Sequence, residues 1–128
     1  MNSRAMLLVT SGASILLLSL HIAEDIVLGF SGGGLSNIFG IAILVVYLCA
    51  TLLWSDQRWG LVILLVMSLL TLVVPIIHMT GAGVGVNRSA GAFFFVWTLY
   101  ALGMSGSFGV ILSVRALLAP RRQSLEAP

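Results

Sequence analysis

Four long apolar stretches, separated by short polar or glycine-rich connections, account for almost the whole chain. They cover about residues 5–28, 38–54, 60–79 and 91–118. Each is close to the roughly 20 residues that a helix needs to cross the hydrocarbon layer of a bilayer. Short connections force consecutive helices to run antiparallel. The pattern predicts an all-α integral membrane protein, an antiparallel bundle of four transmembrane helices.

The same pattern predicts the domain organisation. Residues 1–118 form one transmembrane domain, and residues 119–128, with two arginines and two prolines, are expected to be a disordered cytoplasmic tail. The alternative for the first segment is a secretory signal peptide, because a charged start precedes an apolar run. That alternative is disfavoured, since cleavage after Ala23 would put His21 where a small residue is required.

Composition agrees with a membrane location. Hydrophobic residues make up 59% of the chain and charged residues 8%, whereas about 25% of a soluble domain is charged. The six basic residues are all arginines and are scattered along the chain, which gives no basic stripe for nucleic acid. The single cysteine, Cys49, excludes an intramolecular disulfide. The bilayer is therefore the expected partner, and nucleic acid is not.

The arginines predict the orientation. With the N-terminus inside, five of them lie on the cytoplasmic side and only Arg88 lies outside. The five are Arg4, Arg58, Arg115, Arg121 and Arg122. Short cytoplasmic loops carry an excess of basic residues, so this bias predicts an N-in, C-in topology. We expect a multi-pass protein of a bacterial-type cytoplasmic (inner) membrane.

Ionisable side chains gather at the outer end of the first segment. In a helix that turns about 100° per residue, Asp25 lies about 40° to one side of His21 and Glu24 about 60° to the other. All three therefore share one face. His78, at the end of segment 60–79, and Arg88, in the loop that follows, fall at a similar depth.

Two hydroxyl side chains extend this polar region inward. Ser14 precedes His21 by seven residues and Thr71 precedes His78 by seven, so each is nearly in line with its histidine. Together with the ionisable group they predict a shallow polar pocket, open to the outer face, between the first and third helices.

Several functions fit such a pocket. A solvated collar that only fixes the topology needs no ligand. A transition-metal site would use His21, Asp25 or Glu24, and His78, because imidazole and carboxylate together suit zinc, iron or copper. The two histidines could instead ligate a haem iron from both sides. A proton- or ion-coupled carrier would use the carboxylates as a relay.

The fourth segment carries a different signal. Small residues recur every four positions and form a ridge that lets another helix approach closely. They are Ala101, Ser105, Gly109 and Ser113. The expected neighbour is another helix of the same chain; otherwise the ridge joins a second protomer or a larger membrane complex.

Aromatic residues begin the same segment at the level of the histidines. They are Phe93, Phe94, Phe95, Trp97 and Tyr100. Such a group is typical of an interfacial aromatic belt. It could also form an apolar wall for a lipid tail or a quinone beside the polar cluster.

The sequence contains no complete catalytic arrangement, so we do not expect an enzyme. The leading hypothesis is an accessory subunit of a larger membrane complex, or a small binding or transport unit with a polar pocket at the outer face. The alternative is a metal- or haem-binding membrane protein, redox- or quinone-linked, that uses His21 and His78.

Overall fold

A computed structural model describes residues 3–29, 33–80 and 90–119 of the chain. Within these residues all regular structure is helical, and it comprises four helices. They are α1 (Ser3–Val27), α2 (Leu35–Leu52), α3 (Arg58–Thr80) and α4 (Ala90–Leu118). Each boundary lies within three residues of the segment expected from the apolar pattern. The expected loop that carries Arg88 and the expected tail from residue 120 onward lie outside the described residues.

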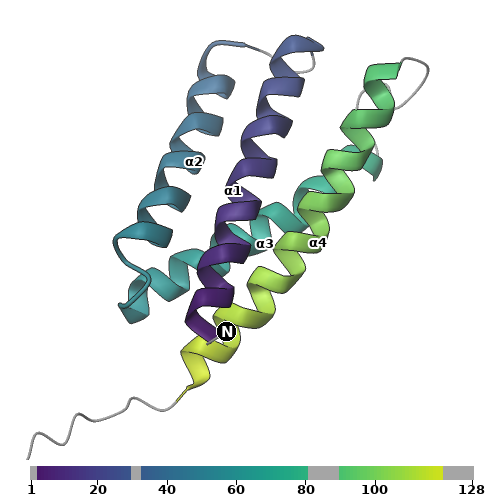
Figure 1. Cartoon of the computed structure of the whole chain (residues 1–128). Coiled ribbons are helices and arrows are strands. Elements are labelled where there is room, and N and C mark those ends of the chain that lie inside the picture. Colours follow the sequence, from purple (N-terminus) through teal and green to yellow (C-terminus); the bar gives the residue numbers. More distant parts are fainter. Residues whose placement is uncertain (1–2, 30–32, 81–89, 120–128) are drawn as a thin grey trace, which may run out of the picture.

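The helices pack as an antiparallel bundle (Figure 1). α1 packs against all three other helices, and α4 packs along both α3 and α1. Among the described residues α2 contacts only α1 and α3. α2 and α3 meet at the hairpin that joins them and diverge toward their other ends (Figure 1). The start of α2 and the end of α3 are therefore farther apart than the two ends joined by the hairpin.

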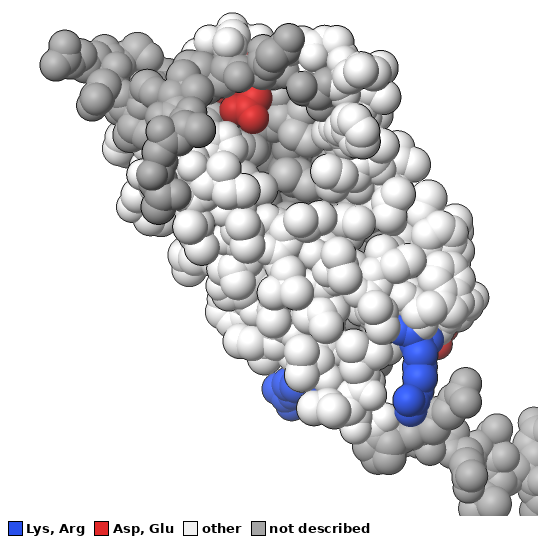
Figure 2. Space-filling model, turned by 180° about the vertical axis from the view of Figure 1, so that it is seen from behind, with Lys and Arg blue, Asp and Glu red and all other residues white. Residues whose placement is uncertain are grey.

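Three of the four helices are long and apolar enough to cross a membrane, namely α1, α3 and α4. α2 is apolar but shorter in its uninterrupted part, Asn37–Leu52. Large aliphatic and aromatic side chains cover the outside of the bundle, among them Val9, Val62 and Phe108, which are about half exposed. Acidic side chains are visible at one end of the molecule, and arginines with one acidic neighbour at the other, with an uncharged surface between the two ends (Figure 2).

The hairpin between α2 and α3 depends on a glycine. A Cβ atom at Gly60 would lie 1.8 Å from the carbonyl oxygen of Trp54, so only glycine permits this approach. The ring centroids of Trp54 and Trp59 are 4.7 Å apart across the turn. At the same end of the bundle Arg4 of α1 forms an ion pair with Asp56 of the turn. These contacts close the arginine-rich end.

The closest helix contact is between α3 and α4. Cβ atoms at Gly103, Gly106 and Gly109 would lie 3.1, 2.7 and 2.4 Å from atoms of α3. The expected ridge of small residues shares only Gly109 with this contact line. Of its other members, Ser113 is buried, and Ala101 and Ser105 are half-buried. Gly103, Gly106 and Gly109 of α4 thus allow close packing against α3 of the same chain, and they are spaced three residues apart.

The interior contains hydroxyl groups as well as aliphatic side chains. Leu7, Leu18, Leu64 and Leu102 are in the core. Fully buried serines accompany them, and the Ser68 hydroxyl lies 3.5 Å from the hydroxyl of buried Tyr47. α4 packs against both α3 and α1, and these contacts bring the polar residues at the ends of α1 and α3 together.

Candidate functional site

The two histidines of the chain meet at the end of the bundle opposite Arg4, Arg58 and Arg115, the arginines that the structure describes. His21 is on the last two turns of α1, and His78 is on the last turn of α3. Their ring centroids are 4.8 Å apart, with the rings nearly perpendicular. The antiparallel bundle brings them together, because α1 and α3 both run toward this end (Figure 1).

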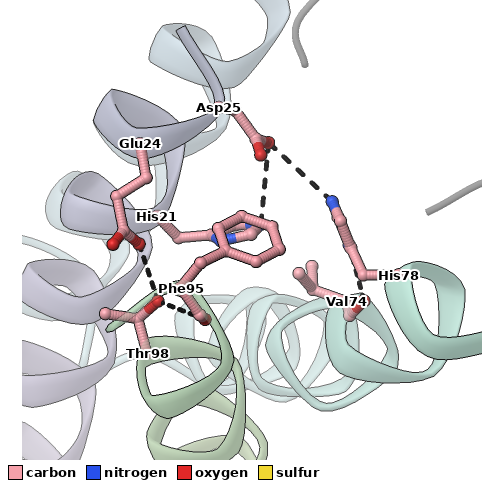
Figure 3. Close-up of polar contacts among 7 residues, drawn as sticks. All are labelled: His21, Glu24, Asp25, Val74, His78, Phe95 and Thr98. Carbon is pink, nitrogen blue, oxygen red and sulfur yellow. Dashed lines mark hydrogen bonds and ion pairs between the residues drawn. The ribbon is translucent and has the colours of Figure 1, made fainter. Parts of the chain in front are cut away.

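Asp25 lies to one side of the two rings and faces both of them (Figure 3). Its Oδ2 atom is 3.6 Å from Nε2 of His21, one helical turn away on α1. The same oxygen is 3.9 Å from Nε2 of His78. One ligand atom from each of His21, Asp25 and His78 lies within 4.8 Å of the other two. Three groups that bind transition metals therefore point at one small volume.

These groups are largely withdrawn from the surface and incompletely hydrogen-bonded. The His21 side chain is 3% exposed. Neither of its ring nitrogens has a hydrogen-bond partner among the described residues, and the same holds for Oδ1 of Asp25. Leaving a buried polar group unpaired costs about 1–3 kcal/mol. A ligand that binds these atoms would remove that cost.

His78 is held by its own helix. Its Nδ1 atom is 2.9 Å from the backbone carbonyl oxygen of Val74, one turn earlier. When Nδ1 carries the proton and donates to this carbonyl, Nε2 is left as the lone-pair nitrogen that faces Asp25. Metal-binding histidines use such an outer hydrogen bond to fix the tautomer and the ring orientation.

Phe95 of α4 forms the apolar wall of the site. Its ring centroid is 5.1 Å from that of His21 and 5.6 Å from that of His78. Phe95 is 1% exposed, whereas Phe93, Phe94 and Trp97 are more than half exposed. The aromatic group at the start of α4 therefore divides: one ring closes the site and the others lie on the outer surface.

Glu24 is next to Asp25 in the sequence but belongs to a different contact. Its Oε2 atom accepts a hydrogen bond of 2.7 Å from the hydroxyl of Thr98 on α4. Figure 3 shows the Glu24 side chain directed away from Asp25 and His78. The expected set of four ionisable groups therefore separates into a His21, Asp25 and His78 cluster and a Glu24–Thr98 pair.

The two expected hydroxyls take different positions. Thr71 lines the cavity beside His21 and His78, and its hydroxyl donates to the carbonyl oxygen of Ser68. Ser14 is fully buried but does not line this cavity; Leu18, one turn closer to His21, lies there instead. Arg88 is outside the described residues.

Thr98 was not among the candidate site residues, and Phe95 was considered only as one of five aromatic residues, although the sequence contained a signal that selects both. Phe95, Leu99, Leu102, Gly106 and Gly109 recur at intervals of three or four residues, which is the spacing of one helix face. Thr98 belongs to the same face. That face is buried in the bundle, and it places one aromatic ring and one hydroxyl beside the polar end of α1.

Comparisons with protein-family models, with curated proteins and with solved structures found no match to this chain. The chemistry of the site therefore has to be argued from its own geometry. Two imidazoles and one carboxylate form a donor set that suits zinc, iron and copper ions. No other group of three or more histidine, cysteine or carboxylate side chains comes together in the described part of the chain.

Proposed function

We propose that this protein is a small multi-pass membrane protein that binds a transition-metal ion through His21, Asp25 and His78. In this role it acts as a binding or transport unit, or as an accessory subunit that supplies the ion to a larger membrane complex. The observation that carries the proposal is the convergence of the three ligand atoms within 4.8 Å of one another.

The distances suit a small ion. With metal–ligand distances of about 2.0–2.2 Å, neighbouring ligand atoms around a tetrahedral ion are roughly 3.4 Å apart. The two separations to Oδ2 of Asp25, 3.6 and 3.9 Å, exceed this value by a few tenths of an ångström. The ligand atoms of the two histidines lie within 4.8 Å of each other, so His21 and His78 must also approach each other for the three atoms to share one coordination sphere. Three protein ligands leave a further position for water or another ligand.

Burial favours a ligand site over a solvated collar. A collar at the membrane surface consists of side chains that reach water, whereas His21 is among the least exposed residues of the protein. His21 lines the cavity, and both of its ring nitrogens lack a hydrogen-bond partner among the described residues. A bound ion would give one of them a partner, and a collar would give it none.

The ring geometry favours a bare ion over a haem. In a bis-histidine haem the macrocycle lies between the two imidazoles. Here the rings are in edge contact at a centroid distance of 4.8 Å, and Phe95 packs on both. That arrangement leaves no space for a macrocycle between the histidines.

The charge distribution supports an orientation for the site. Arg4 is in the first turn of α1, Arg58 begins α3 and Arg115 is in the last turn of α4, so all three lie at the end of the bundle opposite the metal-binding cluster. By the positive-inside rule the arginine end is cytoplasmic. We therefore propose an N-in, C-in topology in a bacterial-type inner membrane, with the ion bound near the outer face.

Metal stoichiometry tests the proposal. The protein should be purified in detergent with a tag that contains no histidine, stripped with a chelator and titrated with Co²⁺, which reports its coordination through visible absorption. We expect about one ion per chain at a three-ligand site, and Zn²⁺ should displace it. The double variant His21→Ala/His78→Ala should not bind Co²⁺. Wild-type protein that remains colourless with Co²⁺ and free of Zn²⁺ would overturn the proposal.

A further inference from the structure

An apolar cavity of about 240 Å³ adjoins the metal-binding cluster, between α1, α2 and α3. His21, Asp25, His78 and Thr71 form its polar part. The rest of the lining is aliphatic and includes Leu18, Ile43, Leu70, Val73 and Ile77, with Gly40 on α2. The cavity is therefore polar at one point and apolar elsewhere, which is the pattern of a site for an amphiphilic molecule.

The cavity opens sideways rather than only toward the end of the bundle. Leu70, Val73 and Ile77 line it and are also 43%, 41% and 56% exposed on the outer surface of α3. A recess is visible beside the acidic surface on the face seen from behind in Figure 2. In a bilayer this opening faces lipid tails. A molecule dissolved in the membrane could enter it without crossing the water phase.

The charge of the cluster indicates the head group. A divalent ion bound to one carboxylate and two neutral imidazoles has a net charge of +1. Glu24 is directed to Thr98 and does not contribute a ligand. In the low dielectric of a membrane protein an uncompensated charge is costly. A singly charged oxygen donor at the open coordination position would neutralise the site.

From this arrangement we infer that the cavity binds an aliphatic carboxylate, with its head on the metal ion and its tail between α2 and α3. This inference rests on the proposed metal-binding function. An apolar cavity of about 150 Å³ is enough to bind benzene, so a cavity of about 240 Å³ has room for a chain of several methylene groups. A medium-chain tail therefore fits inside, and a longer one extends through the opening into the lipid.

Octanoate titrated into the Co²⁺-loaded protein in lipid nanodiscs tests this inference. Binding of the head at the open position should change the visible absorption of Co²⁺. Acetate has the same head without the tail, and octanol has a similar tail without the charge. We expect half-saturation by octanoate at a concentration at least about tenfold below that for either comparison compound. Acetate lacks the methylene groups whose burial favours binding, and octanol lacks the negative charge that would neutralise the metal site.

Variants that fill the cavity distinguish octanoate binding in the cavity from simple partitioning of octanoate into the lipid. Val73→Trp fills the cavity from α3, and Val66→Trp is the matched control, at an exposed position of the same helix that lines no part of it. Gly40→Leu fills it from α2, where a new Cβ would meet only the flexible side chain of Ile22, at 3.3 Å. Either filling variant should bind Co²⁺ like wild type and lose at least about nine-tenths of the octanoate response.

The possible failures are distinguishable. A protein that binds no Co²⁺ overturns the proposed function and this inference with it. Normal Co²⁺ binding with equal responses to octanoate and acetate overturns the inference alone, because the tail is then not recognised. Equal responses to octanoate and octanol would show that the site does not recognise a negatively charged head group. An octanoate response that persists in both filling variants would show that octanoate binds outside this cavity.

Discussion

The Nε2 atom of His78 lies 3.9 Å from the Oδ2 atom of Asp25, which joins the end of α3 to the end of α1 through a carboxylate. His21 approaches the same oxygen from within α1. His21 and Asp25 of α1 and His78 of α3 thereby share one volume beside the ring of Phe95.

The neighbouring carboxylates should differ in their effect on metal binding. Asp25→Asn removes the charged ligand and should weaken Co²⁺ or Zn²⁺ binding by at least about 100-fold, since even outer-shell changes weaken metal sites by 10- to 100-fold. Glu24→Gln is the matched control, because an amide oxygen can still accept the hydrogen bond from Thr98. Competition titration with a chromogenic chelator measures both. Equal losses in the two variants would contradict the assignment of Asp25.

Metal should stabilise the folded protein. Binding of Zn²⁺ to the folded state alone adds about 2.7 kcal/mol to the free energy of unfolding at a free concentration 100 times Kd. Thermal unfolding in detergent, followed by circular dichroism, should therefore shift upward on addition of Zn²⁺. The same addition should leave His78→Ala unchanged. A shift of equal size in that variant would show that Zn²⁺ acts somewhere other than this cluster.

The helical segments were predictable because long apolar stretches of this kind are compatible with only one structure, the membrane-spanning helix. Stretches of 17 to 28 apolar residues cannot be solvated, and helices satisfy their own backbone hydrogen bonds. The end at which His21 and His78 lie also followed, since antiparallel order fixes direction. The largest difference in a helix boundary, three residues, is at the start of α2, because the polar residues Ser36 and Asn37 precede the apolar run and yet are helical.

Side-chain partners were less predictable, as the residues around Asp25 illustrate. Angular spacing put His21, Glu24 and Asp25 on one face, but it could not tell which carboxylate turns toward α3 and which toward α4. That choice depends on Thr98, whose position follows from the packing of α4. In the same way, Gly103 and Gly106 contact α3 because of the crossing of the two helices, which a search for residues at intervals of four misses.

The proposed orientation predicts opposite labelling of the two ends of α1 and its neighbours. In a Cys49→Ser background, Val27→Cys, beside the cluster, should react with a membrane-impermeant maleimide on intact cells. Gln57→Cys, in the turn near Arg4 and Asp56, should react only after permeabilisation. Both positions are exposed, so accessibility in the protein does not separate them. The reverse labelling pattern would place the cluster on the cytoplasmic side.

The contact between α3 and α4 should be intolerant of a single added methyl group. In Gly106→Ala the new Cβ would lie 2.7 Å from the backbone nitrogen of Leu72 and 2.9 Å from the carbonyl oxygen of Ser68. Because these are backbone atoms, the helices must separate. We expect a loss of about 1–3 kcal/mol in the free energy of unfolding, the usual cost of overpacking.

Gly12→Ala provides the matched control for that substitution. Nothing lies within 4 Å of a Cβ at Gly12, and alanine favours a helix by roughly 0.5–1 kcal/mol over glycine. This variant should therefore be as stable as wild type or slightly more stable. Unfolding in mixed micelles, titrated with a denaturing detergent, compares the three proteins. Equal stability of Gly106→Ala and Gly12→Ala would mean that α4 does not approach α3 as closely as its glycines allow. The position of Phe95 over the two histidines would then lose its support, because the same helix contact carries that ring to the site.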